Sequence, residues 1–282
     1  MSTAPTPPQQ VPATAPPAAP WQPPPGVYTS PIPITRTHLG HALASEWTKI
    51  KSVRSTMWTL GVFLVLVVGI GLLVAQQTGR TDYVDTPYTV PAFFGLLLGQ
   101  ICLITLGVLV ISSEYGTGMI RTTLTASPAR WRVLAAKLII FFAVAFTVSF
   151  LAIGFVGLVT AEMHRGASAE PWLGSLFKGT LYSSLTGVLS VAVGTMMRHS
   201  AGAITTMLGL VLVPSILPAF MATSSSLEPM AEVMLDYAAP NALSMLFGLN
   251  TSSDGTPQLV FLIVLTAAAV AGAFALLDRR DV

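Results

Sequence analysis

The chain has few charged residues and a single cysteine. Only 9% of its 282 residues are charged, while 52% are hydrophobic, and the mean hydropathy is +0.70. A soluble domain carries roughly 25% charged residues, so this composition excludes an ordinary soluble protein and indicates a membrane protein. The cysteine, Cys102, lies in an apolar run. It cannot form a disulfide within the chain, and we expect it to pack as a small hydrophobic side chain.

The motifs of several enzyme classes are also missing. No GxxxxGK segment followed by Ser or Thr is present, so the chain has no phosphate-binding loop of its own for ATP. No GxSxG segment occurs, and the histidines are scattered without the spacing of metal ligands. We therefore expect no enzyme, no catalytic residue, no metal and no bound cofactor. The net charge of +2 gives no indication of a nucleic-acid partner, and none is expected.

The first 34 residues differ from the rest because they contain 12 prolines, with alanine, threonine and glutamine between them. Without an apolar period they cannot build a core, so we expect residues 1–34 to form a disordered, partly polyproline-II tail on the cytoplasmic side. A secretory signal peptide is not expected here. A ligand for a proline-binding domain is the functional alternative to a solvated tail.

Residues 35–282 contain six apolar runs, each about as long as the roughly 20 residues that a helix needs to cross a bilayer. Lipid offers no hydrogen bonds to a backbone, so we expect helices. No charge interrupts the runs except Lys137 and Lys178, each near a span end where a lysine can extend to the interface. The middle of the spans holds no ionisable side chain of the kind that proton- or cation-driven transporters commonly use. The predicted spans are 57–75, 91–111, 133–160, 176–197, 203–222 and 258–277.

The distribution of basic residues predicts the orientation of these six spans. With the N-terminus inside, 11 of the 14 lysines and arginines fall in cytoplasmic segments and 3 fall outside. The positive-inside rule therefore places both termini in the cytoplasm of a multi-pass protein of the plasma membrane.

An amphipathic helix is expected before the first span. Leu39, Leu43, Trp47 and Ile50 follow one another at spacings of 4, 4 and 3 residues and form one apolar stripe. We expect this helix to lie on the inner membrane face, with Trp47 and Trp58 at the headgroup level. The residues assigned to this interfacial helix are Trp47, Lys49, Lys51 and Arg54. A plain helical extension of the first span is the alternative.

A polar segment at 112–132 separates the second and third spans. Gly116 and Gly118 weaken helix propensity, so a break there and a short helix over 118–125 are expected, ended by Ser127-Pro128. Glu114 and Arg121 lie two helical turns apart. This segment could dock a soluble partner, and an ordinary cytoplasmic loop with topogenic charges is the alternative.

The segment 223–257 is too long for a plain connector and too apolar for solvated coil. We expect two short helices, split by Pro240-Asn241, that either dip back into the outer leaflet or cap the bundle. Pro214 and Pro218 should kink the fifth span.

A GxxxG pair, Gly95 and Gly99, suits close helix packing in the second span. Because glycine is common in membrane helices, a chance occurrence of this pair is the alternative.

Three stretches resemble the ABC-2 type permeases, which are the membrane subunits of ATP-binding-cassette exporters. Residues 46–56, EWTKIKSVRST, are similar to the start of actinobacterial members. Residues 114–125, EYGTGMIRTTLT, with Ser127-Pro128 and Arg130, resemble the coupling loop of the family, and residues 239–242, APNA, resemble its outer segment before span six. The resemblance covers about 36–282. Gly116 stands where the family usually has a basic residue.

The resemblance implies an all-α membrane protein that forms a substrate path and hydrolyses nothing itself. A separate ATPase subunit would bind ATP and magnesium, and a second permease, identical or paralogous, would complete a dimer in the bilayer. The residues that would contact the ATPase are Glu114, Tyr115, Gly118, Ile120, Arg121 and Leu124. A non-transporting membrane scaffold or sensor and an ATP-independent carrier are the alternatives.

Overall fold

The computed structural model describes residues 38–79, 86–126, 129–165, 171–250 and 253–279. All of them belong to one compact unit, Thr37–Val282. The predicted proline-rich tail and the Ser127-Pro128 turn lie outside the described residues. Within those ranges every regular element is a helix.

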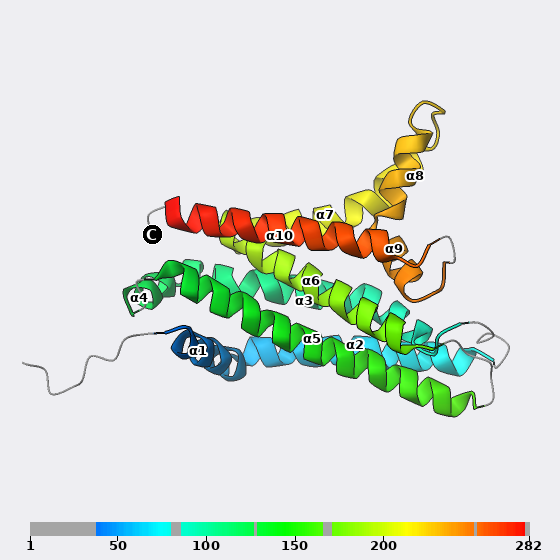
Figure 1. The fold of residues 1–282 in the computed structure, drawn as a ribbon, viewed down its shortest axis with the longest axis horizontal. Helices are drawn as coiled ribbons and strands as arrows, with labels where there is room; N and C mark the ends of the chain where they lie inside the picture. The colour runs from blue at the N-terminus through cyan, green and yellow to red at the C-terminus, as the bar shows by residue number, and fades with distance from the viewer. Residues whose placement is uncertain (1–37, 80–85, 127–128, 166–170, 251–252, 280–282) are drawn as a thin grey trace, which may run out of the picture. The chain divides into compact units, whose positions relative to one another are not determined.

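In the described part of the chain, six helices are long and apolar enough to cross a membrane, which confirms the predicted number of spans. Figure 1 shows them running side by side. The longest, α5, has 34 residues and a length of about 51 Å at 1.5 Å per residue, so it exceeds a bilayer core of about 30 Å. The six are α2 (Arg54–Gln77), α3 (Val90–Gly116), α5 (Arg130–Met163), α6 (Leu173–Met197), α7 (Ser200–Met221) and α10 (Thr256–Arg279).

Helix α6 lies at the centre and packs against α3, α5, α7 and α10. Its mean hydropathy of 1.3 is the lowest of the six spans, yet its hydrophobic window is the most buried. The two facts agree because α6 hides polar side chains from lipid. Its buried hydroxyls include those of Ser183, Ser184 and Ser190, and each donates to the carbonyl four residues earlier.

Close contact between α2 and α3 depends on glycine. A Cβ atom added at Gly95 would lie 2.6 Å from the Val67 backbone, and one at Gly99 would lie 2.9 Å from the Val67 side chain. The two glycines therefore lie on the face of α3 that contacts α2, where small residues let two backbones approach.

Four short helices accompany the spans: α1 (Leu39–Ser52), α4 (Met119–Ala126), α8 (Glu228–Asp236) and α9 (Ala239–Leu246). Val53 has an extended backbone between α1 and α2, so α1 is a separate helix and the alternative of a plain extension is wrong. The predicted split at Pro240-Asn241 is also wrong. The chain breaks at Tyr237 and Ala238, and Pro240 lies in the first turn of α9, where its missing N–H leaves no hydrogen bond unmade.

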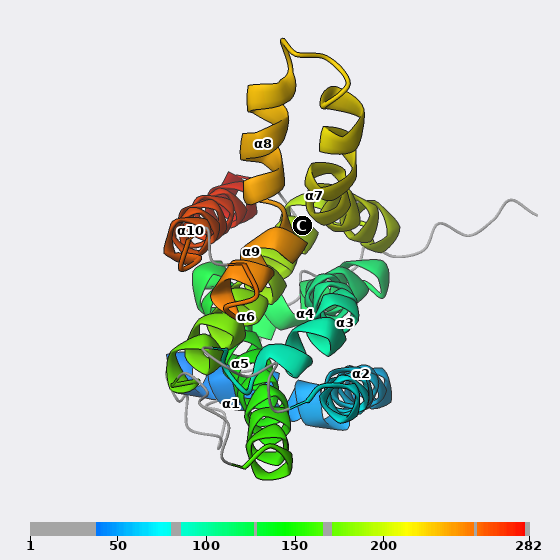
Figure 2. The same ribbon diagram turned by 90° about the vertical axis from the view of Figure 1, so that its right-hand side faces the viewer.

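Helix α7 continues through Pro214 and Pro218. Its last turns run beside α8 and away from the other spans (Figure 2). Helix α9 instead caps the bundle, because its Ala242 and Leu243 are fully buried.

The two ends of the bundle carry different elements. Figure 1 shows α1, α4 and the end of α10 at one end, which we call the α4 end, and α8 and α9 at the other, the α9 end.

Candidate functional site

Four charged side chains from three helices meet at the α4 end. Glu46 and Lys49 come from α1, Glu114 from α3 and Lys137 from α5. The Lys137 ammonium lies 2.6 Å from Glu46 Oε2 and 2.8 Å from Glu114 Oε1. Lys49 Nζ lies 2.7 Å from Glu46 Oε1 and 3.0 Å from the same Glu114 oxygen. We call these four residues the ion cluster.

Lys137 is the best satisfied member of the ion cluster. It is 1% exposed, and besides its two carboxylate contacts it donates to the Val110 carbonyl at 3.3 Å. Its three N–H donors therefore have three acceptors. The expectation that Lys137 extends to the membrane interface is wrong, because two carboxylates hold it inside the protein.

The ion cluster joins α1, α3 and α5 with balanced charge, two lysines against two glutamates. Moving a charged side chain out of water costs several kcal/mol, so a buried charge is stable only beside a close group of opposite charge. Separating α3 or α5 from the other two helices would leave a buried charge unpaired, whereas α1 would keep its own Glu46–Lys49 pair. The cluster therefore resists independent movement of the helix ends more strongly than an apolar contact would.

Lys49 is the partly exposed member of the cluster and lies outside the spans. Burial alone would lower its pKa. Glu46 and Glu114 act in the opposite direction through their hydrogen bonds and their negative charges. Together they outweigh burial and raise the pKa of Lys49 above its ordinary value. The side chain is therefore a cation at neutral pH.

Helix α4 lies next to the ion cluster and follows directly from α3. Thr117 caps α3, and Gly118 has φ of +71°, which glycine adopts without strain. The predicted break at the two glycines is confirmed, and α4 differs from the predicted 118–125 helix by one residue at each end.

One face of α4 packs inward and the opposite face is exposed. Ile120 is 4% exposed in the apolar core, and Leu124 packs partly buried against that core. At 100° per residue, the other side of the helix carries an exposed face that we call the α4 face: Met119, Arg121, Thr122 and Thr125.

The structure separates the residues that the sequence assigned to partner contact. Glu114 is 6% exposed and bound to lysines, and Ile120 is buried, so neither side chain is presented to a partner. Tyr115 is half-buried, with the Arg198 guanidinium 5.2 Å from its ring centre. Gly118 and Arg121 are exposed.

The residues assigned to the interfacial helix on the inner membrane face lie in α1 and at the first residue of α2. Trp47 is 47% exposed, and Lys51 places its ammonium 5.4 Å from the Trp47 ring. Arg54 is exposed at the start of α2, whereas Lys49 belongs to the ion cluster.

Sequence reasoning missed the roles of Glu46 and Lys137. A signal was present, because Glu46, Glu114 and Lys137 each lie at the predicted inner end of an apolar segment. Charges at one membrane depth, with opposite signs and on separate helices, are candidates for pairing.

Comparison with known protein families identifies one match over this region. Residues 42–213 match the family model described as ABC-2 family transporter protein. The match covers more than half of the chain and includes the ion cluster and α4. A comparison with curated proteins gives no match.

Proposed function

Because the chain belongs to the ABC-2 transporter family, we propose that it is the permease subunit of an exporter that a separate ATPase subunit drives. The family model supports a membrane component of an ABC transporter. The observation that carries the finer proposal is the position of α4, a short amphipathic helix beside a buried ion cluster that joins three other helices.

In this proposal the ATPase binds the α4 face. A cleft on the ATPase would receive Met119, which is 50% exposed, beside the cationic Arg121 and the two threonines. An apolar side chain at the centre of a polar surface is a common arrangement in protein interfaces. Ile120 holds α4 against the bundle, and Glu114 lies in the ion cluster at the end of α3.

The ion cluster would pass movement from α4 to the spans. When the ATPases close on ATP, a force on α4 reaches α3 through the short Thr117-Gly118 link. The cluster then couples the end of α3 to α5 and α1, so these helices move together and change access to the path.

The orientation and the partners complete the proposal. The excess of basic residues supports a cytoplasmic α4 end, where a soluble ATPase could reach it. A second permease, a copy or a paralogue, would supply the other half of the path in the plasma membrane.

A pull-down in mild detergent with an ATPase assay of the eluate tests the proposal. Wild-type chain should recover a nucleotide-binding subunit and ATP hydrolysis, and Arg121→Glu on the α4 face should reduce both at least tenfold. Arg279→Glu is the matched control, because Arg279 is also exposed and ends α10 at the α4 end. It should retain the partner.

Well-folded chain that recovers no nucleotide-binding subunit and no hydrolysis would contradict the proposal and favour the carrier or the scaffold. Equal loss in the Arg121 and Arg279 variants would refute the assignment of the α4 face.

A further inference from the structure

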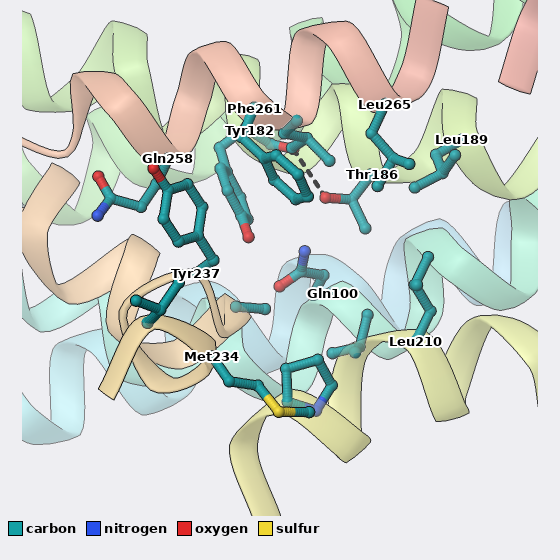
Figure 3. A pocket seen from close by; sticks show the side chains of 15 residues that line it. Gln100, Tyr182, Thr186, Leu189, Leu210, Met234, Tyr237, Gln258, Phe261 and Leu265 are labelled. Carbon is teal, nitrogen blue, oxygen red and sulfur yellow. Dashed lines mark hydrogen bonds between the residues drawn. The ribbon is translucent and has the colours of Figure 1, made fainter. Parts of the chain in front are cut away.

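A cavity of about 440 Å³ lies toward the α9 end, well away from the ion cluster. Side chains of α3, α6, α7, α8, α9 and α10 line it (Figure 3). The volume falls within the range of about 300–1,000 Å³ that is typical of small-molecule sites. The lining is mostly apolar, and none of the described residues that form it is charged.

Two glutamines in the lining each have one amide atom without a hydrogen-bond partner among the described residues. Gln100 is 3% exposed and its amide nitrogen has no acceptor, and Gln258 is 6% exposed and its amide oxygen has no donor. Figure 3 shows the Gln100 amide among the lining side chains, on the side of the cavity where Tyr182 and Thr186 lie.

A buried amide without a partner is costly, whereas leucine would fit an apolar wall at no such cost. Gln100 in this position therefore indicates that another molecule supplies the missing acceptor. An anionic or cationic head would enter this mostly apolar cavity without a counter-charge, which is unfavourable.

We propose that this cavity binds an uncharged amphiphile, whose apolar body fills the space between α6, α7 and α10 and whose hydroxyl, ester or carbonyl oxygen accepts a hydrogen bond from Gln100. Thr186 donates its own hydroxyl to the Tyr182 carbonyl and keeps its oxygen as a further acceptor toward the ligand. The site itself depends on the cavity alone, and only its assignment as the cargo site rests on the proposed function.

Photo-crosslinking of the full chain in phosphatidylcholine vesicles tests the site with two probes that carry the same diazirine acyl chain. One is a monoacylglycerol, which is uncharged, and the other is the free fatty acid at pH 9, which is an anion. Mass spectrometry should locate monoacylglycerol label on the segments around Gln100, Met234 and Phe261, in competition with unlabelled monoacylglycerol. The fatty acid should label them much less.

Gln100→Leu should weaken monoacylglycerol binding about five- to tenfold, which corresponds to one lost hydrogen bond. It should also raise the thermal stability of the ligand-free protein, because it removes an unsatisfied polar group. Gln77→Leu, the same change at an exposed position ending α2, is the matched control and should leave labelling unchanged.

Three results would overturn the proposal: equal labelling by the fatty acid, undiminished labelling of the Gln100→Leu variant, or a lower melting temperature of that variant. The last result would mean that the amide already has a partner in the protein.

A second arm adds the ATPase subunit and ATP to the vesicles and distinguishes the source of the ligand. Labelling that falls during hydrolysis identifies transported cargo, and labelling that stays constant identifies a resident membrane lipid. Both outcomes support the site. Only the first supports the proposed function as well, so the two proposals can fail separately.

Discussion

Replacing Lys137 by methionine should destabilise the protein more than a typical core substitution does. The change keeps an unbranched side chain of similar length and removes the charge that contacts both Glu46 and Glu114. Each contact, at 2.6 and 2.8 Å, supplies roughly 6 kcal/mol of Coulomb energy at an effective dielectric constant near 20. Repulsion by Lys49 and the cost of burying the ammonium offset much of this. Breaking a buried pair from one side leaves a net loss of about 3–5 kcal/mol.

The double variant Lys137→Met with Glu114→Leu tests whether charge is the cause. It removes one cation and one anion, so the remaining pair of Glu46 and Lys49, 2.7 Å apart, is again neutral. Replacing a buried ion pair by apolar side chains is often neutral or stabilising. The double variant should therefore be more stable than Lys137→Met alone by at least about 2 kcal/mol, a positive coupling that neighbouring sites can show.

Equilibrium unfolding in mixed micelles titrated with SDS measures these free energies for the wild type, the two single variants and the double variant. If the losses of the single variants simply add in the double variant, the two side chains are not coupled and the argument from the ion cluster is refuted. A loss below 1 kcal/mol for Lys137→Met would show that water reaches the carboxylates.

Two further predictions concern helix packing and pH. Gly95→Ala should lower the free energy of unfolding by more than about 1 kcal/mol, because the new Cβ would lie 2.6 Å from the Val67 backbone. At Gly69 a new Cβ would have nothing within 4 Å, so Gly69→Ala should leave the free energy of unfolding unchanged or raise it by up to about 1 kcal/mol. Similar losses in both variants would contradict the close contact between α2 and α3. Since the pKa of Lys49 is raised above 10.5 in the folded protein, its contribution should be complete at neutral pH and decline only as the pH rises through that higher pKa. Unfolding measured from pH 7 to 11 should therefore show a fall above pH 10.5 that Lys49→Met abolishes, and a fall between pH 7 and 9 would contradict this sign.

The spans and the short helices could be predicted from the sequence because their signals are local. Apolar runs of membrane length identify the six spans, and Gly116 and Gly118 mark the break before α4. The same local logic misplaced the boundary between α8 and α9. It treated Pro240 as a helix breaker, although proline is equally suited to a first helical turn.

The ion cluster is harder to predict than the spans, because its members are far apart in the sequence. Glu46 and Lys137 are separated by 91 positions, and only the packing of α1 against α5 brings them together. Hydropathy identified Lys137 as a charge near a span end but could not tell a side chain that faces headgroups from one that faces a neighbouring helix. For the same reason Glu114 was assigned to a partner surface, whereas the structure buries it between two lysines.

Helix α3 connects the two proposals, since it carries Gln100 in the cavity and Glu114 in the ion cluster. The two residues are 14 positions apart, which corresponds to about 21 Å of uninterrupted helix. A displacement of the α4 end must therefore tilt or shift the segment that lines the cavity. It follows that two variants should fail in opposite ways. Gln100→Leu should weaken binding of the amphiphile and retain ATPase coupling, whereas the Lys137→Met and Glu114→Leu double variant should retain binding and lose transport per ATP. If both variants lost both properties, the cavity and the cluster would not be separable parts of one mechanism.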